Sequence, residues 1–205
     1  MSELFEIPQN FKGTAWADDE KYQQMYRQSL ENPEAFWAEQ AERVDWFKKW
    51  DKVLDWNYHE ANIRWFEGGQ LNVSYNCLDR HLEKKGDQIA LIWEGDDPEE
   101  DRSFTYRELH EQVCRFANVL KQQGIEKGDR VMIYMPMVPE LAMACLACAR
   151  IGAIHSVVFG GFSAEALKSR IQDCGGKMMI TADAGLRGKK SVPLKANADA
   201  AMEGT

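Results

Sequence analysis

Two glycines stand between an apolar strand-like segment and a helix-like segment, where a ligand can approach the backbone. The stretch VVFGGFSAEAL (Val157–Leu167) places Gly160 and Gly161 between apolar and aromatic residues and a helix-like tail. Glycine permits the backbone angles of a tight turn, and it leaves space beside the backbone. No Gly-Lys-Ser/Thr follows, and the spacing is not G-x-G-x-x-G, so neither common phosphate-binding motif is present. The pair alone leaves a structural turn and a ligand-binding turn as open alternatives.

A second candidate is a basic segment near the end of the chain. From residue 184 to 198 there is no acidic residue, but four cations are present: Arg187, Lys189, Lys190 and Lys195. In a chain with a formal net charge of -8, one locally basic segment is able to bind an anion. Ordinary surface lysines are the alternative. The sequence pI of about 5.1 argues against nucleic-acid binding through a broadly basic surface.

Other reactive residue types have structural interpretations. Cys145 and Cys148 form a C-x-x-C inside an apolar helical run, and we expect them to be small buried side chains. The histidines form no metal-binding pair and are interpreted as structural: His59, His81, His110 and His155. No G-x-S-x-G is present to supply a hydrolase serine. The acidic stretch GDDPEEDR (Gly95–Arg102) is expected to be a solvated loop.

The elements that must position the glycines and the basic segment follow an alternating pattern. A capping box at Thr105 and Glu108 predicts a helix start, and Gly124 predicts its end. The other expected elements alternate along the chain: strand 88–93, strand 130–135, helix 139–151 closed by Gly152, strand 155–159, helix 163–173 and strand 177–182. Alternation of this kind predicts β-α-β units and a mainly parallel sheet. Ligands bind beyond the C-terminal ends of such strands, which is where Gly160 and Gly161 fall.

The first third of the chain has a different character. Six of the seven tryptophans lie there. Asn32 and Pro33 predict a helix start. The stretch DWFKKWDKVLDW (Asp45–Trp56) mixes aromatic and charged residues at irregular spacing. We expect residues 1–80 to form helices and loops whose aromatic side chains pack onto a larger body, and residues 81–205 to begin an α/β domain.

Composition bounds the class of protein. The 205 residues are 44% hydrophobic and 28% charged, as in a soluble globular protein. No apolar run approaches the roughly 18 residues of a membrane helix, and the N-terminus lacks a signal-peptide pattern. The five cysteines do not suggest a disulfide scaffold, so a reducing cytoplasm is the expected location. We expect neither a nucleic-acid nor a membrane partner.

Three stretches together resemble one enzyme family. They are LNVSYNCLDRHL (Leu71–Leu82), MPMVPELAMACLACARIGAIHSVVFGGFSAEAL (Met135–Leu167) and ITADAGLRGKKSVPLK (Ile180–Lys195). All resemble the acetyl-coenzyme A synthetases, which are AMP-forming acetate–CoA ligases of the adenylate-forming superfamily. FTYREL (Phe104–Leu109) resembles the first core motif of that superfamily. The likeness covers nearly the whole chain, and Leu71–Leu82 distinguishes this family from the wider superfamily.

The resemblance implies a fold, a reaction and a set of ligands. The fold is a helical, Trp-rich N-terminal segment followed by the first part of an adenylate-forming domain. Acetate attacks the α-phosphate of ATP with help from Mg²⁺, and the CoA thiol then displaces AMP to give acetyl-CoA. The implied CoA-binding residues are Phe159, Gly160 and Gly161 along the CoA path, and Arg187, Gly188, Lys189 and Lys190 at its 3′-phosphate ADP end. Lys190 stands where many relatives carry arginine.

The chain also departs from the family pattern. No phosphate loop resembling T-S-G-S/T-T-G-x-P-K-G is present, because the only threonines are Thr14, Thr105, Thr181 and Thr205. No catalytic residue and no Mg²⁺ ligand of the family falls within these residues. We therefore expect a fragment or truncated product that is inactive by itself. A sibling ligase for propionate and a non-catalytic CoA-binding or dimerising module remain as alternatives, and the oligomeric state stays open.

Overall fold

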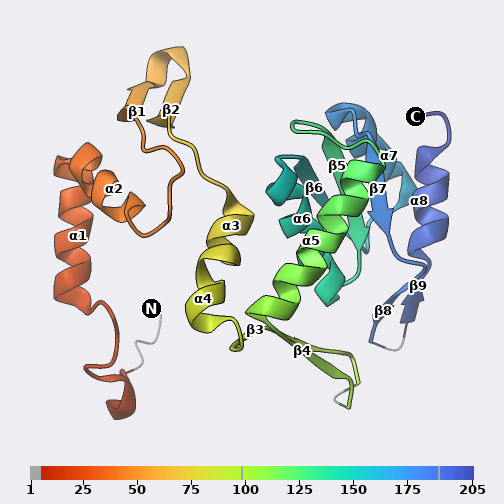
Figure 1. Ribbon diagram of the computed structural model, residues 1–205, viewed down its shortest axis with the longest axis horizontal. Helices are drawn as coiled ribbons and strands as arrows, with labels where there is room; N and C mark the ends of the chain where they lie inside the picture. Colours follow the sequence, from red (N-terminus) through yellow and green to blue (C-terminus); the bar gives the residue numbers. More distant parts are fainter. Residues whose placement is uncertain (1–5, 98, 189) are drawn as a thin grey trace. The chain divides into compact units, whose positions relative to one another are not determined.

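The computed structural model of the chain describes residues 6–97, 99–188 and 190–205. The fold divides into two units, Met1–Gln70 and Leu71–Thr205. Figure 1 shows the helices and a hairpin of the first unit, and the sheet and helices of the second. A domain boundary at residue 80 stays a prediction.

The first unit begins with helices. After a 3-10 turn at Gln9–Phe11 come α1 (Asp19–Glu31) and α2 (Pro33–Ala41). Pro33 is at the start of α2, as predicted, although the side chain of Asn32 makes no capping hydrogen bond. The ammonium of Lys21 lies over the indole of Trp16, 3.9 Å from the ring centroid.

The prediction of only helices and loops up to residue 80 is wrong for the rest of this unit. β1 (Lys52–Asn57) and β2 (Asn62–Glu67) form an antiparallel hairpin around a 3-10 turn at Tyr58–Glu60. Aromatic contacts explain the hairpin, since rings from before β1 and from β2 pack together. Trp46 lies 5.0 Å from Trp50 and 5.3 Å from Phe66 between ring centroids. Trp37 lies 5.8 Å from Trp65.

The second unit starts with a short helical segment that holds the end of a later helix. It contains α3 (Val73–Cys77), a 3-10 turn (Asp79–His81) and α4 (Leu82–Lys85). The Asp79 carboxylate accepts hydrogen bonds from both terminal nitrogens, Nη1 and Nη2, of Arg150, at 2.7 and 2.8 Å. His110 Nε2 lies 3.2 Å from the same carboxylate. The amide of Asn72 donates to the carbonyl of Ala149 at 2.9 Å, so the segment caps α6 (Pro139–Ile151).

A parallel three-stranded sheet forms the centre of the second unit, as predicted. Its strand order is β6-β5-β7, with β5 at Arg130–Met135, β6 at Ile154–Phe159 and β7 at Met178–Thr181. The connecting helices are α6 and α7 (Ala164–Cys174). Gly152 closes α6 in a left-handed conformation, φ 77°, which favours glycine.

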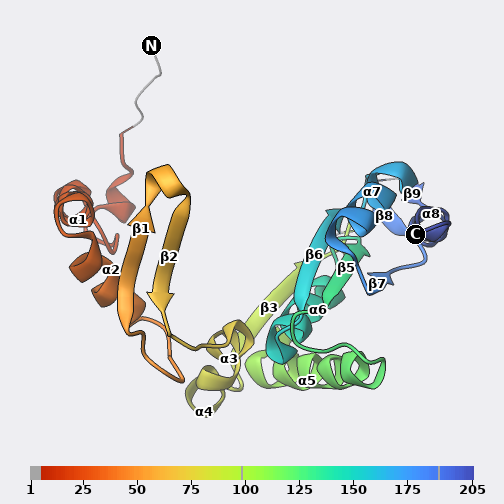
Figure 2. The same cartoon turned by 90° about the horizontal axis from the view of Figure 1, so that it is seen from above.

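Helices cover both faces of this sheet (Figure 2). On one face α5 (Tyr106–Gln122) and α6 pack with Val131 and Ile133 of β5. On the other face α7 and α8 (Leu194–Met202) pack with Met132 and Tyr134. β5 therefore has its side chains buried on both sides, which explains its unbroken apolar sequence.

Two antiparallel hairpins flank the parallel sheet. β3 (Ile89–Glu94) pairs with β4 (Asp101–Thr105), and β8 (Gly185–Arg187) pairs with β9 (Lys190–Val192). The prediction of a buried strand at 88–93 is wrong in this respect, since Ile89 and Ile92 are exposed. A short apolar run does not by itself reveal whether one face of a strand meets solvent.

The start of α5 provides a test of the sequence-derived capping box. Thr105 Oγ1 accepts a hydrogen bond from the Glu108 backbone N–H at 3.2 Å, and the Glu108 carboxylate accepts one from the Thr105 backbone N–H at 2.8 Å. Replacing Thr105 with alanine should therefore destabilise the second unit by about 1 kcal/mol. Urea unfolding measures the loss of stability, and hydrogen exchange of the α5 amides locates it. Thr105→Ser keeps the oxygen and is the control, and equal stability of the alanine and serine variants would contradict the capping role.

Candidate functional site

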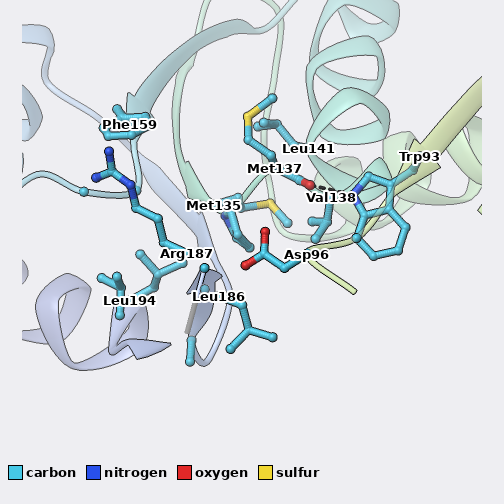
Figure 3. Close-up of a pocket in the computed structure, with 18 of the residues that line it drawn as sticks. Trp93, Asp96, Met135, Met137, Val138, Leu141, Phe159, Leu186, Arg187 and Leu194 are labelled. Atoms are coloured by element: carbon cyan, nitrogen blue, oxygen red, sulfur yellow. Dashed lines mark hydrogen bonds between the residues drawn. The ribbon is translucent and has the colours of Figure 1, made fainter. Parts of the chain in front are cut away.

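A cavity of about 750 Å³ opens at the C-terminal ends of β5 and β6 (Figure 3). One wall is the loop that follows β5, residues 135–138, with Leu141 of α6. A second wall is the end of β6 with Gly160 and Gly161, and a third is β8. The β3–β4 hairpin completes it. The glycine pair and Arg187 therefore line one cavity, at the edge of the sheet where the sequence predicts ligand binding.

The glycines are required for space rather than for backbone angles, because neither has a positive φ. A Cβ atom on Gly160 would lie 3.3 Å from the Met135 carbonyl oxygen. On Gly161 it would lie 2.8 Å from the Phe159 ring and 3.3 Å from Nη1 of Arg187. The turn is thus closely packed against the aromatic ring and the guanidinium beside it, and a larger residue would displace one of them.

Tyr134 positions the same turn, a role that sequence patterns do not reveal. Its side chain is fully buried on β5, with the hydroxyl 2.8 Å from the Phe162 carbonyl and 3.3 Å from that of Gly160. The amide of Asn197 on α8 donates to the hydroxyl at 3.3 Å. A buried hydroxyl requires such partners. The turn after β6 is therefore fixed to β5 and to α8.

Arg187 is held in place without an acidic partner. Its guanidinium lies over the ring of Phe159, 5.3 Å from the centroid. Among the described residues it forms no ion pair with a carboxylate. A guanidinium of this kind offers five N–H donors in a fork that fits phosphate. Gly161 and Phe159 together orient this charge at the wall of the cavity.

The other cations of the basic segment have different positions. Lys190 is the cross-strand neighbour of Arg187 in the β8–β9 hairpin, and it is exposed outside the cavity wall. Gly188 forms the turn with φ 59°. Lys195 forms an ion pair with Asp199 on α8 at 2.5 Å. Lys189 lies outside the described residues.

Three carboxylates share the cavity with Arg187. Glu94, Asp96 and Glu100 lie at the tip of the β3–β4 hairpin and line its wall. The expectation of a solvated loop in Gly95–Arg102 is confirmed by the exposure of Asp96, Asp97, Glu99 and Glu100, but the stretch ends within β4 and its tip also lines the cavity. The sequence does not reveal this placement, because the tip and β8 are far apart along the chain and come together only in the fold.

Comparison with known proteins identifies the family of this chain. The model of the family described as "AMP-binding enzyme" matches residues 78–204, more than half of the chain. The chain belongs to the AMP-binding enzyme family. Residues 22–77 match a second family, described as "Acetyl-coenzyme A synthetase N-terminus".

Several curated relatives of this chain are named as acetyl-coenzyme A synthetases. A protein named acetyl-coenzyme A synthetase from Syntrophus aciditrophicus is 60% identical over 97% of this chain and 31% of its own length. One of the same name from Halorhodospira halophila is 56% identical over 100% of the chain and 32% of its own length. Acetyl-coenzyme A synthetase 2 of Pseudomonas putida is 61% identical over 89% and 28%. The resemblance inferred from the motifs is confirmed, and the chain spans about a third of the length of these relatives.

Two of the five cysteines, Cys145 and Cys148, lie on α6 and pack with the core. Cys148 is fully buried, and burial raises the pKa of its thiol to about 11. Burial also raises the pKa of Cys145. Raised values keep both thiols protonated at neutral pH. The expectation of a small buried side chain is confirmed for Cys148, whereas Cys145 is half-buried against the same core. Within the described ranges, no three His, Cys, Asp or Glu side chains gather as a metal site, and no helix is long and apolar enough to cross a membrane.

Proposed function

We propose that this chain is the N-terminal part of an acetate–CoA ligase. The enzyme activates acetate with ATP, giving acetyl-AMP and pyrophosphate, and transfers the acetyl group to CoA in the cytoplasm. The observation that carries the proposal is Arg187, whose guanidinium lies beside the Gly160–Gly161 turn in the cavity at the ends of the parallel strands and has no carboxylate partner among the described residues. The names of the relatives support it.

The part of the reaction assigned to this chain is CoA binding. Arg187 and Lys190 neutralise the phosphates at the 3′-phosphate ADP end, with Gly188 and Lys189 in the turn between them. Arginine supplies forked donors and lysine supplies a point charge. Phe159, Gly160 and Gly161 lie along the proposed CoA path at the end of β6, and the missing side chain of Gly161 gives room for the Phe159 ring and the Arg187 guanidinium. The apolar walls, among them Met135 and Leu141, exclude water from the path of the pantetheine arm.

We expect the residues that bind ATP and Mg²⁺ to lie outside this chain, as the family resemblance implies. Mg²⁺ neutralises phosphate charge in reactions of this class. The described residues do not gather into a metal site, and no phosphate-loop sequence is present.

The purified 205-residue chain should bind CoA but should show no acetate-dependent exchange of pyrophosphate into ATP. Calorimetry with CoA and an isotope-exchange assay measure the two properties. A ligase of the relatives' length that carries this chain is the positive control for exchange. Exchange by the 205-residue chain above a no-protein blank would contradict the assignment of adenylation to residues outside it.

The acyl substrate is tested with the same longer ligase. We expect acetate to support exchange with a higher kcat/KM than propionate. A preference for propionate would replace the acetate assignment with the sibling ligase. Binding of CoA by the chain, with no exchange by the longer protein on either acid, would instead favour a non-catalytic CoA-binding module.

A further inference from the structure

Two side chains of the β3–β4 hairpin fasten its acidic tip to the opposite wall of the cavity. The indole Nε1–H of Trp93 donates to the Met137 carbonyl at 2.6 Å. Arg102, the cross-strand partner of Trp93, places its guanidinium over the indole at 5.2 Å from the centroid. The same guanidinium makes two hydrogen bonds to the Glu140 carboxylate, at 2.9 and 3.0 Å. We call this set of contacts, Trp93–Met137 and Arg102–Glu140, the clamp.

The clamp joins the hairpin to a firmly held element. Glu140 stands in the first turn of α6, directly after the buried Pro139. A carboxylate there is favoured by the helix dipole. The two hydrogen bonds from Arg102 lower the pKa of Glu140, although burial opposes this shift. The ion pair is therefore maintained at neutral pH, and α6 provides a fixed support for the hairpin.

The tip itself has little other support. Asp96, Asp97, Glu99 and Glu100 are exposed. The packing of this hairpin on the core involves Ala90, Leu91 and Phe104, away from the tip. The backbone contact between Gly95 and Glu100, at 2.7 Å, is internal to the hairpin. Without the clamp, the described residues of the tip would be held in place through the two strands of the hairpin.

The charges explain what this anchoring achieves. Glu94, Asp96 and Glu100 line the same cavity as Arg187, yet Arg187 has no carboxylate partner among the described residues. Opposite charges that share a cavity attract each other. An acidic tip that moved freely would pair with the guanidinium and compete with an anionic ligand. Figure 3 shows Asp96 and Arg187 on neighbouring walls, with the Arg187 guanidinium directed toward Phe159.

We propose that Trp93 and Arg102 are positioning residues that hold the acidic tip away from Arg187, so that the guanidinium stays available to a phosphate-bearing ligand. This inference rests on the proposed CoA site. It adds that anion affinity depends on residues that do not themselves contact the anion.

The test variant is Trp93→Phe combined with Arg102→Gln, which removes both contacts of the clamp and retains a ring at position 93. We expect CoA affinity of the 205-residue chain, measured by calorimetry, to fall roughly fivefold, the value of one competing ion pair. Arg64→Gln is the matched control. It cuts the 3.0 Å ion pair of another strand arginine with Glu67 in the first unit, and affinity should not change.

A rescue separates this mechanism from simple loss of structure. Replacing Glu94, Asp96 and Glu100 with their amides in the clamp-deficient chain should restore wild-type affinity or better, since no carboxylate then competes. If affinity stays low after neutralisation, the clamp supports the fold of the site and the proposal is wrong. Unchanged affinity in the clamp-deficient chain would also overturn it.

A second readout does not depend on CoA. Hydrogen exchange of the Arg187 Nε–H, followed by NMR, should slow in the clamp-deficient chain because the guanidinium gains a carboxylate partner. Neutralising the tip should restore fast exchange. Identical exchange in all three chains would refute the proposal even if CoA binds. Failure of the wild-type chain to bind CoA, with the expected exchange pattern, would refute only the CoA assignment.

Discussion

Replacing Arg187 with alanine is expected to weaken CoA binding roughly 10- to 150-fold. The guanidinium is fixed over Phe159 and has no carboxylate partner among the described residues, so in the proposed CoA site it is available for charge-assisted hydrogen bonds to a ligand phosphate. Calorimetry on the 205-residue chain measures the loss directly. Lys190→Ala should have a smaller effect, because an exposed ammonium makes a single point contact that salt screens. Raising the salt concentration should weaken CoA binding to the wild type more than to the Arg187 variant.

The Arg187 variant also separates the two half-reactions in a ligase of the relatives' length. Adenylation precedes CoA binding, so acetate-dependent pyrophosphate exchange should be nearly unchanged while the KM for CoA rises. Arg115→Ala removes an exposed arginine from α5 and is the control of equal charge. Equal losses of exchange and CoA-dependent turnover, with a lower melting temperature, would show that Arg187 supports the fold and would contradict its role in CoA binding.

The parallel sheet was predictable because its signals are local. β5 is an apolar run, and α6 begins at Pro139 and ends at Gly152. Each boundary depends on residues within a few positions of it. The β1–β2 hairpin was missed for the opposite reason. Its stability comes from rings brought together across the fold, such as Trp46 with Phe66, and irregular spacing along the sequence does not reveal such pairs.

The residues of the candidate site likewise fall into those that local sequence indicates and those that it does not. Gly160 is indicated by its position between a strand and a helix, and Arg187 by a locally basic segment and the family resemblance; the structure places both at one cavity. The hydrogen bonds of Tyr134 with Phe162 and of Trp93 with Met137 join residues 28 and 44 positions apart. A tyrosine or tryptophan in an apolar strand is indistinguishable in sequence from a core aromatic residue. Long-range contacts that position the site are therefore visible in the three-dimensional structure and not in the sequence.

Replacing Asp79 with asparagine is expected to destabilise the second unit by about 3 kcal/mol. The side chains of Asp79 and Arg150 are only 20% and 26% exposed, so the change leaves a guanidinium largely buried without its counter-charge. The lost contacts join the segment before β3 to α5 and α6. Hydrogen exchange of α6 amides under native conditions measures the loss without interference from the first unit. Asp87→Asn is the control, because that carboxylate is 94% exposed in its pair with Arg107.

A double variant tests whether the unpaired charge is the cause. Adding Arg150→Met to Asp79→Asn removes the stranded guanidinium, and most of the lost stability should return. If the double variant is as unstable as Asp79→Asn alone, the effect arises from altered packing of the Val73–Lys85 segment instead.

The same ion pair predicts how stability depends on pH. Burial raises the pKa of Asp79, but the hydrogen bonds and charge of Arg150 and the nearby His110 outweigh it and lower the pKa below its usual value. A carboxyl group with a lowered folded-state pKa stabilises the fold fully above its unfolded pKa, about 3.9, and loses this contribution as the pH falls through the folded value. The stability difference between wild type and Asp79→Asn should therefore be largest near neutral pH and shrink below about pH 4. Unfolding free energies from urea titrations across that range measure the trend, and a difference independent of pH would show that ionised Asp79 does not stabilise the end of α6.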